Sequence, residues 1–158
     1  MERLVKISDF GLTREGETYK MDPHCRVPIR WLAPEVLRTA TYSQKTDVWA
    51  FGIMSWEIFA GQEPYPGMTV AEVNGQVRQQ GYRMTFPEGT PIDMSTLIVR
   101  MCWTEDPNER ASMADVSHAL EKLTNLPRPP LVSTTNTEPQ TNVQSRSKKS
   151  KAKKKGGK

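Results

Sequence analysis

Ser43 to Ala60 reads SQKTDVWAFGIMSWEIFA, and its apolar residues fall nearly all the way round a helix. Ser43 is a residue type that caps helix N-termini, and Gly61 is one that ends helices. The apolar positions are Val48, Trp49, Phe51, Ile53, Met54, Trp56, Ile58 and Phe59. A helix that is apolar on every face must be buried on every face, so this stretch predicts the central helix of a domain.

The segments around this helix predict a mainly helical domain. Pro34 suits the first turn of a short helix that starts near Ala33. Thr69 and Glu72 form a capping box for a helix that stops at Gly81. Two further amphipathic helices are expected at Met94, Leu97, Ile98 and Met101, and from Ser112 to before Pro127 with Val116, Leu120 and Leu123 toward the core. A short strand is expected at 4–7 and a long polar loop at 11–29.

The positive charge of the chain is concentrated at its C-terminal end. The 158 residues carry a net charge of +4, but residues 127–158 alone carry nine basic residues and one acidic residue. Residues 1–126 therefore hold thirteen basic and seventeen acidic residues, so the body is mildly acidic. The tail has almost no apolar residue to bury and is expected to be disordered. It is a solvated tail, a nucleic-acid or nuclear-localisation segment, or an attachment to anionic lipid.

Several classes of protein are disfavoured by composition. Cys25 and Cys102 lie far apart, and His24 and His118 are the only histidines, so a zinc site is improbable. No apolar run reaches the length of a transmembrane segment, and the start of the chain lacks the apolar core of a signal peptide. We therefore expect a cytoplasmic location, with a nuclear or membrane-peripheral one as the alternative that the basic tail allows.

Five short motifs occur in order along the chain. They are Asp9-Phe10-Gly11, Ala33-Pro34-Glu35, Asp47-Val48-Trp49 with Phe51-Gly52, Cys102-Trp103, and Asp106-Pro107 with Arg110. In order and spacing they resemble the C-terminal lobe of a protein kinase. The resemblance implies a mainly α, protein-kinase-like fold for residues 1–126, as a C-lobe fragment. Its activation segment would be 9–35, its helices would surround a buried central helix, and a disordered basic tail would follow at 127–158.

A tyrosine-kinase subgroup is indicated by Val27 to Glu35, which reads VPIRWLAPE. This stretch resembles the tyrosine-kinase form of the segment, in which Pro28, Arg30 and Trp31 are substrate-positioning residues. The wall beside Pro28 and Trp31 suits a flat, long tyrosine side chain. The resemblance implies ATP-dependent phosphorylation of tyrosine in protein substrates by a non-receptor, Fes/Fer-like enzyme.

The resemblance implies ATP and Mg²⁺ as cofactors, with Asp9, Phe10 and Gly11 at the cofactor site. The Asp9 carboxylate would be the metal ligand that holds Mg²⁺ against the phosphates. Magnesium needs only one or two protein carboxylates, so one aspartate is chemically sufficient. Phe10 and Gly11 fit a hinge, because glycine permits a backbone change beside an aromatic group that packs in or out. The alternative is a solvated loop aspartate before a buried phenylalanine.

Tyr19 resembles the regulatory phosphosite of the activation segment. Phosphorylation would add about two negative charges and order the loop against cationic groups. Arg14, Lys20 and Arg26 are near it in sequence. The alternative is an ordinary exposed loop tyrosine.

Three residues would serve the architecture. Glu35 and Arg110 resemble the buried ion pair that ties the activation segment to the lower helices. The family usually has proline after this arginine, whereas Ala111 stands here, so we expect a looser turn with the same role. Asp47 resembles the residue that bonds the backbone of the catalytic loop, and an aspartate on an apolar helix requires partners.

The sequence contains no Gly-rich phosphate loop, no Val-Ala-x-Lys and no His-Arg-Asp, and eight residues before Asp9 cannot hold a catalytic loop. With the catalytic base absent, we expect this chain by itself neither to bind ATP well nor to transfer phosphate. Three hypotheses follow: the C-terminal half of a tyrosine kinase, a non-catalytic binding module that docks on a kinase or regulatory protein, or a binder of anionic lipid or nucleic acid through the tail.

Overall fold

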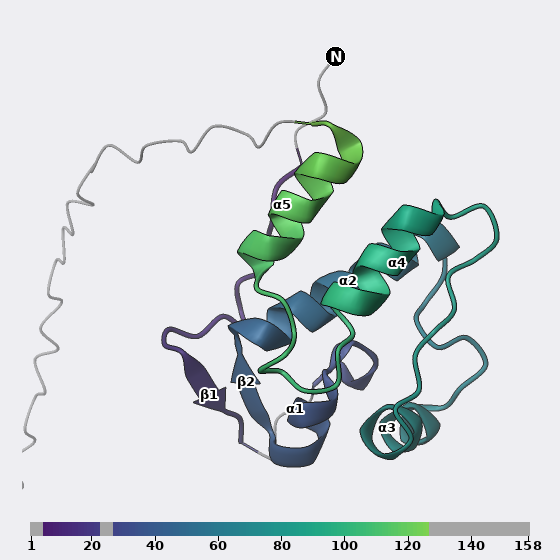
Figure 1. Ribbon diagram of the computed structural model, residues 1–158. Coiled ribbons are helices and arrows are strands. Elements are labelled where there is room, and N and C mark those ends of the chain that lie inside the picture. Colours follow the sequence, from purple (N-terminus) through teal and green to yellow (C-terminus); the bar gives the residue numbers. More distant parts are fainter. Residues whose placement is uncertain (1–4, 23–26, 127–158) are drawn as a thin grey trace, which may run out of the picture. The chain divides into compact units, whose positions relative to one another are not determined.

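The computed structural model describes residues 5–22 and 27–126 of the chain. The predictions for the basic tail at 127–158, for Leu4 and for Arg26 lie outside the described residues. Five α-helices, one 3-10 helix and two short strands occur within the described part (Figure 1). They are β1 (Thr18–Lys20), η1 (Ile29–Trp31), α1 (Pro34–Thr39), β2 (Thr41–Ser43), α2 (Gln44–Ala60), α3 (Val70–Gln79), α4 (Ile92–Met101) and α5 (Met113–Thr124).

The α2 helix lies at the centre of the helical part of the domain (Figure 1). It contacts β2, η1, α4 and α5, while α3 contacts η1 and α1. Its boundaries follow the sequence, since Ser43 forms a capping box with Thr46 and Gly61 ends the helix in the left-handed conformation with φ 63°. The mainly helical fold that the resemblance implies is confirmed, as is the central position of this helix.

Three other helices begin where the sequence predicts, whereas α3 ends at Gln79, two residues before the predicted stop at Gly81. Pro34 opens α1, the capping box of Thr69 and Glu72 opens α3, and Ser112 with Asp115 opens α5. The last of these helices ends at Thr124, because Asn125 turns left-handed before Pro127 is reached. Local side-chain hydrogen bonds therefore set the starts of α2, α3 and α5, while Pro34 marks the start of α1.

The core is built where α2 meets the segment that follows α4. Trp49 and Ile53 are fully buried on α2, and they share one cluster with Cys102 and Trp103. Gly52 permits this close approach, because a Cβ at Gly52 would lie 2.6 Å from Trp103 Nε1 and 2.8 Å from Cys102 Cβ. The glycine is therefore a packing requirement of the core.

Three local expectations are wrong. The predicted strand at 4–7 is absent from its described part: Val5 and Ile7 are exposed and pair with neither described strand, and an apolar run without a partner strand gains no ladder hydrogen bonds. The loop predicted at 11–29 contains β1, which pairs antiparallel with β2. The α2 helix is not buried on every face, since Met54 and Ile58 are 45% and 70% exposed.

Among the described residues, none of the helices combines the length and the apolar character that crossing a membrane would require.

Candidate functional site

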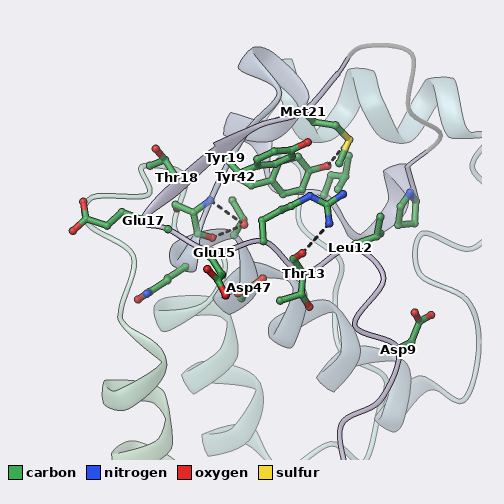
Figure 2. A pocket seen from close by; sticks show the side chains of 17 residues that line it. Asp9, Leu12, Thr13, Glu15, Glu17, Thr18, Tyr19, Met21, Tyr42 and Asp47 are labelled. Atoms are coloured by element: carbon green, nitrogen blue, oxygen red, sulfur yellow. Dashed lines mark hydrogen bonds between the residues drawn. The ribbon is translucent and has the colours of Figure 1, made fainter. Parts of the chain in front are cut away.

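A hollow of about 310 Å³ lies between the 9–21 segment and the start of α2 (Figure 2). Four carboxylates and one guanidinium line it: Asp9, Glu15, Glu17, Asp47 and Arg14. In Figure 2 Asp9 and Glu17 lie at opposite ends of the labelled group. The excess of carboxylates makes this hollow a negative surface on which a cation is favoured.

Asp9 occupies an unusual backbone conformation for a residue with a side chain. Its φ is 62°, and the Gly11 N–H donates to Asp9 Oδ1 over 3.4 Å, while the Thr13 N–H donates to the Phe10 carbonyl over 3.0 Å. The resulting turn leaves the carboxylate exposed, and Phe10 is 65% exposed beside it. An exposed carboxylate suits Mg²⁺, which retains several waters when it binds to protein. No cluster of three or more metal-ligating side chains occurs within the described segments.

Tyr19 lies in β1 opposite Tyr42 of β2. The Arg14 guanidinium stands over the Tyr19 ring, 5.2 Å from its centroid, and donates to the carbonyls of Gly11 and Thr13 over 3.2 and 2.8 Å. Tyr42 donates its hydroxyl to the Met21 sulfur over 3.7 Å (Figure 2). Of the cations expected near Tyr19, Arg14 is therefore already in contact with its ring.

The structure brings Glu35 and Arg110 together in a bidentate pair. Arg110 Nη1 donates to Glu35 Oε1 over 2.7 Å, and Nη2 donates to Oε2 over 2.9 Å. The guanidinium is fully buried, and its other N–H groups donate to the Thr104 and Lys45 carbonyls at 2.8 to 3.1 Å. It also lies 5.2 Å from the centre of the Trp49 ring. These bonds join α1, the start of α2 and the turn before α5.

The turn at Ala111 is tethered rather than loose. The Ala111 N–H donates to the Met101 carbonyl over 3.2 Å, a bond that a proline at this position could not make. The expected looser turn is therefore replaced by a backbone link from the Arg110 turn to the end of α4.

Asp47 is exposed in the first turn of α2 and lines the hollow. Partial desolvation by its surroundings raises the pKa of Asp47 above its ordinary value. No hydrogen bond or ion pair reaches this carboxylate from the residues that the structure describes. The partner that an aspartate on this helix was expected to need is therefore not among them.

Pro28, Arg30 and Trp31 lie at the η1 turn. Pro28 lines the hollow, and Trp31 Nε1 donates to Glu57 Oε2 of α2 over 2.8 Å. The Arg30 guanidinium points to the segment after α2, where it donates to three backbone carbonyls. Of these three side chains, Pro28 borders the hollow, Trp31 is bonded to α2, and Arg30 is bonded to the link that follows α2.

One ion-pair cluster was missed by sequence reasoning. Glu105 accepts from Arg38 of α1 and, over 2.6 Å, from Arg83. Burial alone would raise the pKa of Glu105, but the hydrogen bonds and charges of both arginines outweigh burial and lower it. These residues are far apart in sequence and form no local motif, so no sequence signal could have identified the cluster.

Comparison with known proteins gives a consistent result. The family model for protein tyrosine and serine/threonine kinases matches residues 1–120. Fer-related kinase 1 of Caenorhabditis elegans is 37% identical over 119 residues, which are 75% of this chain and 30% of that protein. Tyrosine-protein kinase ABL2 of Homo sapiens is 43% identical over 123 residues, which are 76% of this chain and 10% of that protein. Tyrosine-protein kinase Fer of Homo sapiens is 41% identical over 120 residues, which are 74% of this chain and 14% of that protein. The chain spans less than a third of each relative.

Proposed function

Because the chain belongs to the protein tyrosine and serine/threonine kinase family, we propose that it supplies the activation segment and helical core for ATP-dependent phosphorylation of tyrosine in proteins. The relatives that are 41% and 43% identical to this chain are tyrosine-protein kinases. Kinases of this family generally use ATP and Mg²⁺. A Fer-like, non-receptor origin is consistent with the two Fer relatives.

The observation that carries the proposal is the arrangement of three parts of one segment around α2. Asp9 presents an exposed carboxylate at the hollow, Trp31 is bonded to α2 through Glu57, and Glu35 is held by Arg110. In phosphoryl transfer the protein acts mainly by positioning and by neutralising charge. Asp9 would hold Mg²⁺ against the phosphates, while Pro28 and Trp31 would form the wall for the substrate tyrosine.

The 158-residue sequence contains no His-Arg-Asp motif and no Gly-rich phosphate loop, which kinases use for the base and the phosphates. We therefore expect no turnover when the chain alone is mixed with Mg²⁺, radiolabelled ATP and a tyrosine peptide. Clear magnesium-dependent turnover that Asp9→Asn abolishes would contradict this expectation.

The function itself is tested by a chimera. In human tyrosine-protein kinase Fer, the matching segment is replaced by residues 5–120 of this chain, and phosphotyrosine on a peptide is measured. We expect activity in the chimera and a loss on the order of 100-fold or more with Asp9→Asn, the size of effect seen when one preorganised electrostatic group is removed from an active site. Glu88→Gln, which neutralises an exposed acid that does not line the hollow, is the control and should leave activity unchanged. An inactive chimera, or one that phosphorylates serine instead, would overturn the proposal.

Regulation by phosphorylation of Tyr19 is part of the same proposal. The Arg14 guanidinium next to its ring could donate to a phosphate there once it releases the Gly11 carbonyl. We expect mass spectrometry to find phosphate on Tyr19 after the chimera is incubated with Mg²⁺-ATP, and activity to rise with it. Tyr19→Phe should remove the rise, whereas Tyr82→Phe should not. An equal rise in the Tyr19→Phe variant would show that Tyr19 is not the switch.

A second candidate function is a non-catalytic module that docks on a kinase or regulatory protein. The exposed apolar side chains of Met54 and Ile58, which are one turn apart on α2, favour it, since neighbouring exposed apolar groups are commonly covered by a partner. Binding of a partner by the folded chain without nucleotide would support this alternative.

The basic tail suggests a further partner, either anionic lipid or nucleic acid, and deletion of residues 144–158 would test it. A cytoplasmic location for the chain is likewise a proposal, which localisation of the tagged chain would test.

A further inference from the structure

Arg30 lies on the η1 turn, which the proposed function places beside the substrate, but its guanidinium is directed to the link between α2 and α3. Its side chain is only 15% exposed. Nη1 donates to the Pro64 and Tyr65 carbonyls over 2.9 and 3.1 Å, and Nη2 donates to the Met68 carbonyl over 2.6 Å. Nε lies 3.2 Å from Glu63 Oε1. All of these acceptors belong to the link between α2 and α3.

These contacts use most of the hydrogen-bonding capacity of Arg30. A guanidinium has five N–H groups, and two from Nη1, one from Nη2 and one from Nε are engaged. We infer that Arg30 is a positioning residue, which binds no substrate itself and holds the η1 turn against the 61–68 link. This inference rests on the proposed function. It gives Arg30 a role different from that of Pro28 and Trp31, which would contact the substrate tyrosine.

The link that Arg30 binds is strained, so it needs such a clamp. Tyr65 has a φ of 55° although it is not glycine, and it is 2% exposed between Pro64 and Pro66. A left-handed residue with a side chain costs roughly tenfold or more in local equilibrium. The Tyr65 N–H faces the Met84 sulfur at 3.0 Å, while the carbonyls of Pro64 and Tyr65 both accept from Arg30. The arginine therefore stabilises the backbone on each side of the strained residue.

The neighbouring side chain fixes the same turn from the other direction. Trp31 donates to Glu57 of α2, and α3 also packs on η1. The turn is thus held between α2 on one side and the link to α3 on the other. Losing the Arg30 bonds would release one of these two attachments and displace the wall formed by Pro28 and Trp31, without altering Asp9.

Hydrogen exchange on the full 158-residue chain tests the clamp without any need for activity. Three amides report on it: Trp31 and Leu32, which close η1, and Met68, which bonds to the Tyr65 carbonyl. Because charged hydrogen bonds are strong, we expect Arg30→Ala to speed their exchange by about tenfold or more. The Val116 amide of α5 should keep its protection.

Two further variants keep this test interpretable. Arg30→Lys retains the charge but lacks the planar fork, so it should restore part of the protection and guards against a failure of Arg30→Ala to fold. Arg100→Ala removes an exposed arginine of α4 and should leave all three amides unchanged. Unchanged exchange at Trp31, Leu32 and Met68 in both Arg30 variants would overturn the inference.

Kinetics in the chimera test the consequence for substrate. We expect Arg30→Ala to raise KM for the tyrosine peptide by about tenfold while KM for ATP and kcat stay nearly constant, since only binding of the peptide is altered. The peptide KM of the Arg30→Lys variant should lie between the values for the unchanged chimera and for Arg30→Ala. A peptide KM that does not change would overturn the positioning role. A chimera without any activity would count against the proposed function, whereas the exchange result judges the clamp by itself.

Discussion

At the scale of single residues, the described domain depends on a few positions where only one side chain fits. Gly52 is such a position because α2 lies against Cys102 and Trp103 without room for a methyl group. Arg110 is another, since a fully buried guanidinium requires the Glu35 carboxylate and nearby carbonyls to offset its desolvation. Both positions connect the central helix to parts of the chain that are distant in sequence.

The requirement at Gly52 gives a sharp stability prediction. We expect Gly52→Ala to lower the free energy of unfolding by about 1–3 kcal/mol, because the new Cβ would overlap Trp103 and force the core to shift. Urea titration followed by tryptophan fluorescence measures the change. Gly75→Ala in α3 is the matched control, since a Cβ there meets nothing within 4 Å.

The control should be neutral or stabilising by about 0.5–1 kcal/mol, because alanine favours a helix more than glycine does. If the two variants had equal stability, the close approach at Gly52 would not be what constrains the core.

At the scale of elements, ion pairs between distant segments join the short helices. Glu105 follows α4 and binds Arg38 of α1 and Arg83 of the 80–91 connection. Arg83 also donates to the Trp103 carbonyl over 2.8 Å and stands 4.5 Å from the centre of the Trp49 ring. This cluster attaches α1, the shortest α-helix of the described part, to the segment that follows α4.

The Glu105 cluster predicts a pH dependence of stability. Its pKa is lower in the folded protein than its ordinary value of 4.5, so the unfolded state binds the proton more tightly. The contribution of Glu105 is therefore fully present above about pH 4.5 and is lost as the pH falls through its folded pKa.

Measured at pH 7 and at pH 3, the difference in unfolding free energy between the wild type and Glu105→Gln should shrink toward the acidic end. The same comparison for Glu88→Gln, an exposed acid, should show no such change. A difference for Glu105→Gln that is independent of pH would contradict the role given to its ion pairs.

At the scale of the whole molecule, the described body is incompletely covered. Met54 and Ile58 are one helical turn apart on α2, so their exposed side chains share a face. Phe10 and Leu12 are 65% and 62% exposed in the 9–21 segment. Apolar surface of this kind favours contact with another protein surface, including a second copy of the same chain.

We therefore expect the purified chain to self-associate as its concentration rises. Replacing two exposed side chains of α2, with Met54→Gln and Ile58→Lys together, should reduce the association seen in sedimentation velocity. Ile92→Lys is the control, because this exposed residue lies on α4 and not on α2. A wild-type chain that stays monomeric across the concentration range would contradict the prediction.

Most of the helix boundaries and the family could be read from the sequence alone. Ser43, Thr69 and Ser112 cap their helices within three residues, and Gly61 ends α2, because capping is a local interaction. The ordered motifs from Asp9 to Arg110 indicated the kinase family, which the comparison supports. The sequence also marked Glu35 and Arg110 as partners, although only through the resemblance.

Only the tertiary structure decided which side chains meet and which faces stay open. Arg30 binds acceptors 34 to 38 residues away, and Glu105 binds an arginine 67 residues away, separations that no local pattern records. The all-round apolar pattern of α2 predicted burial on every side, yet Ile58 is exposed, since a pattern states what a helix can bury and not what lies beside it. Local sequence therefore determined where the elements begin and end, while long-range packing determined the site that they form.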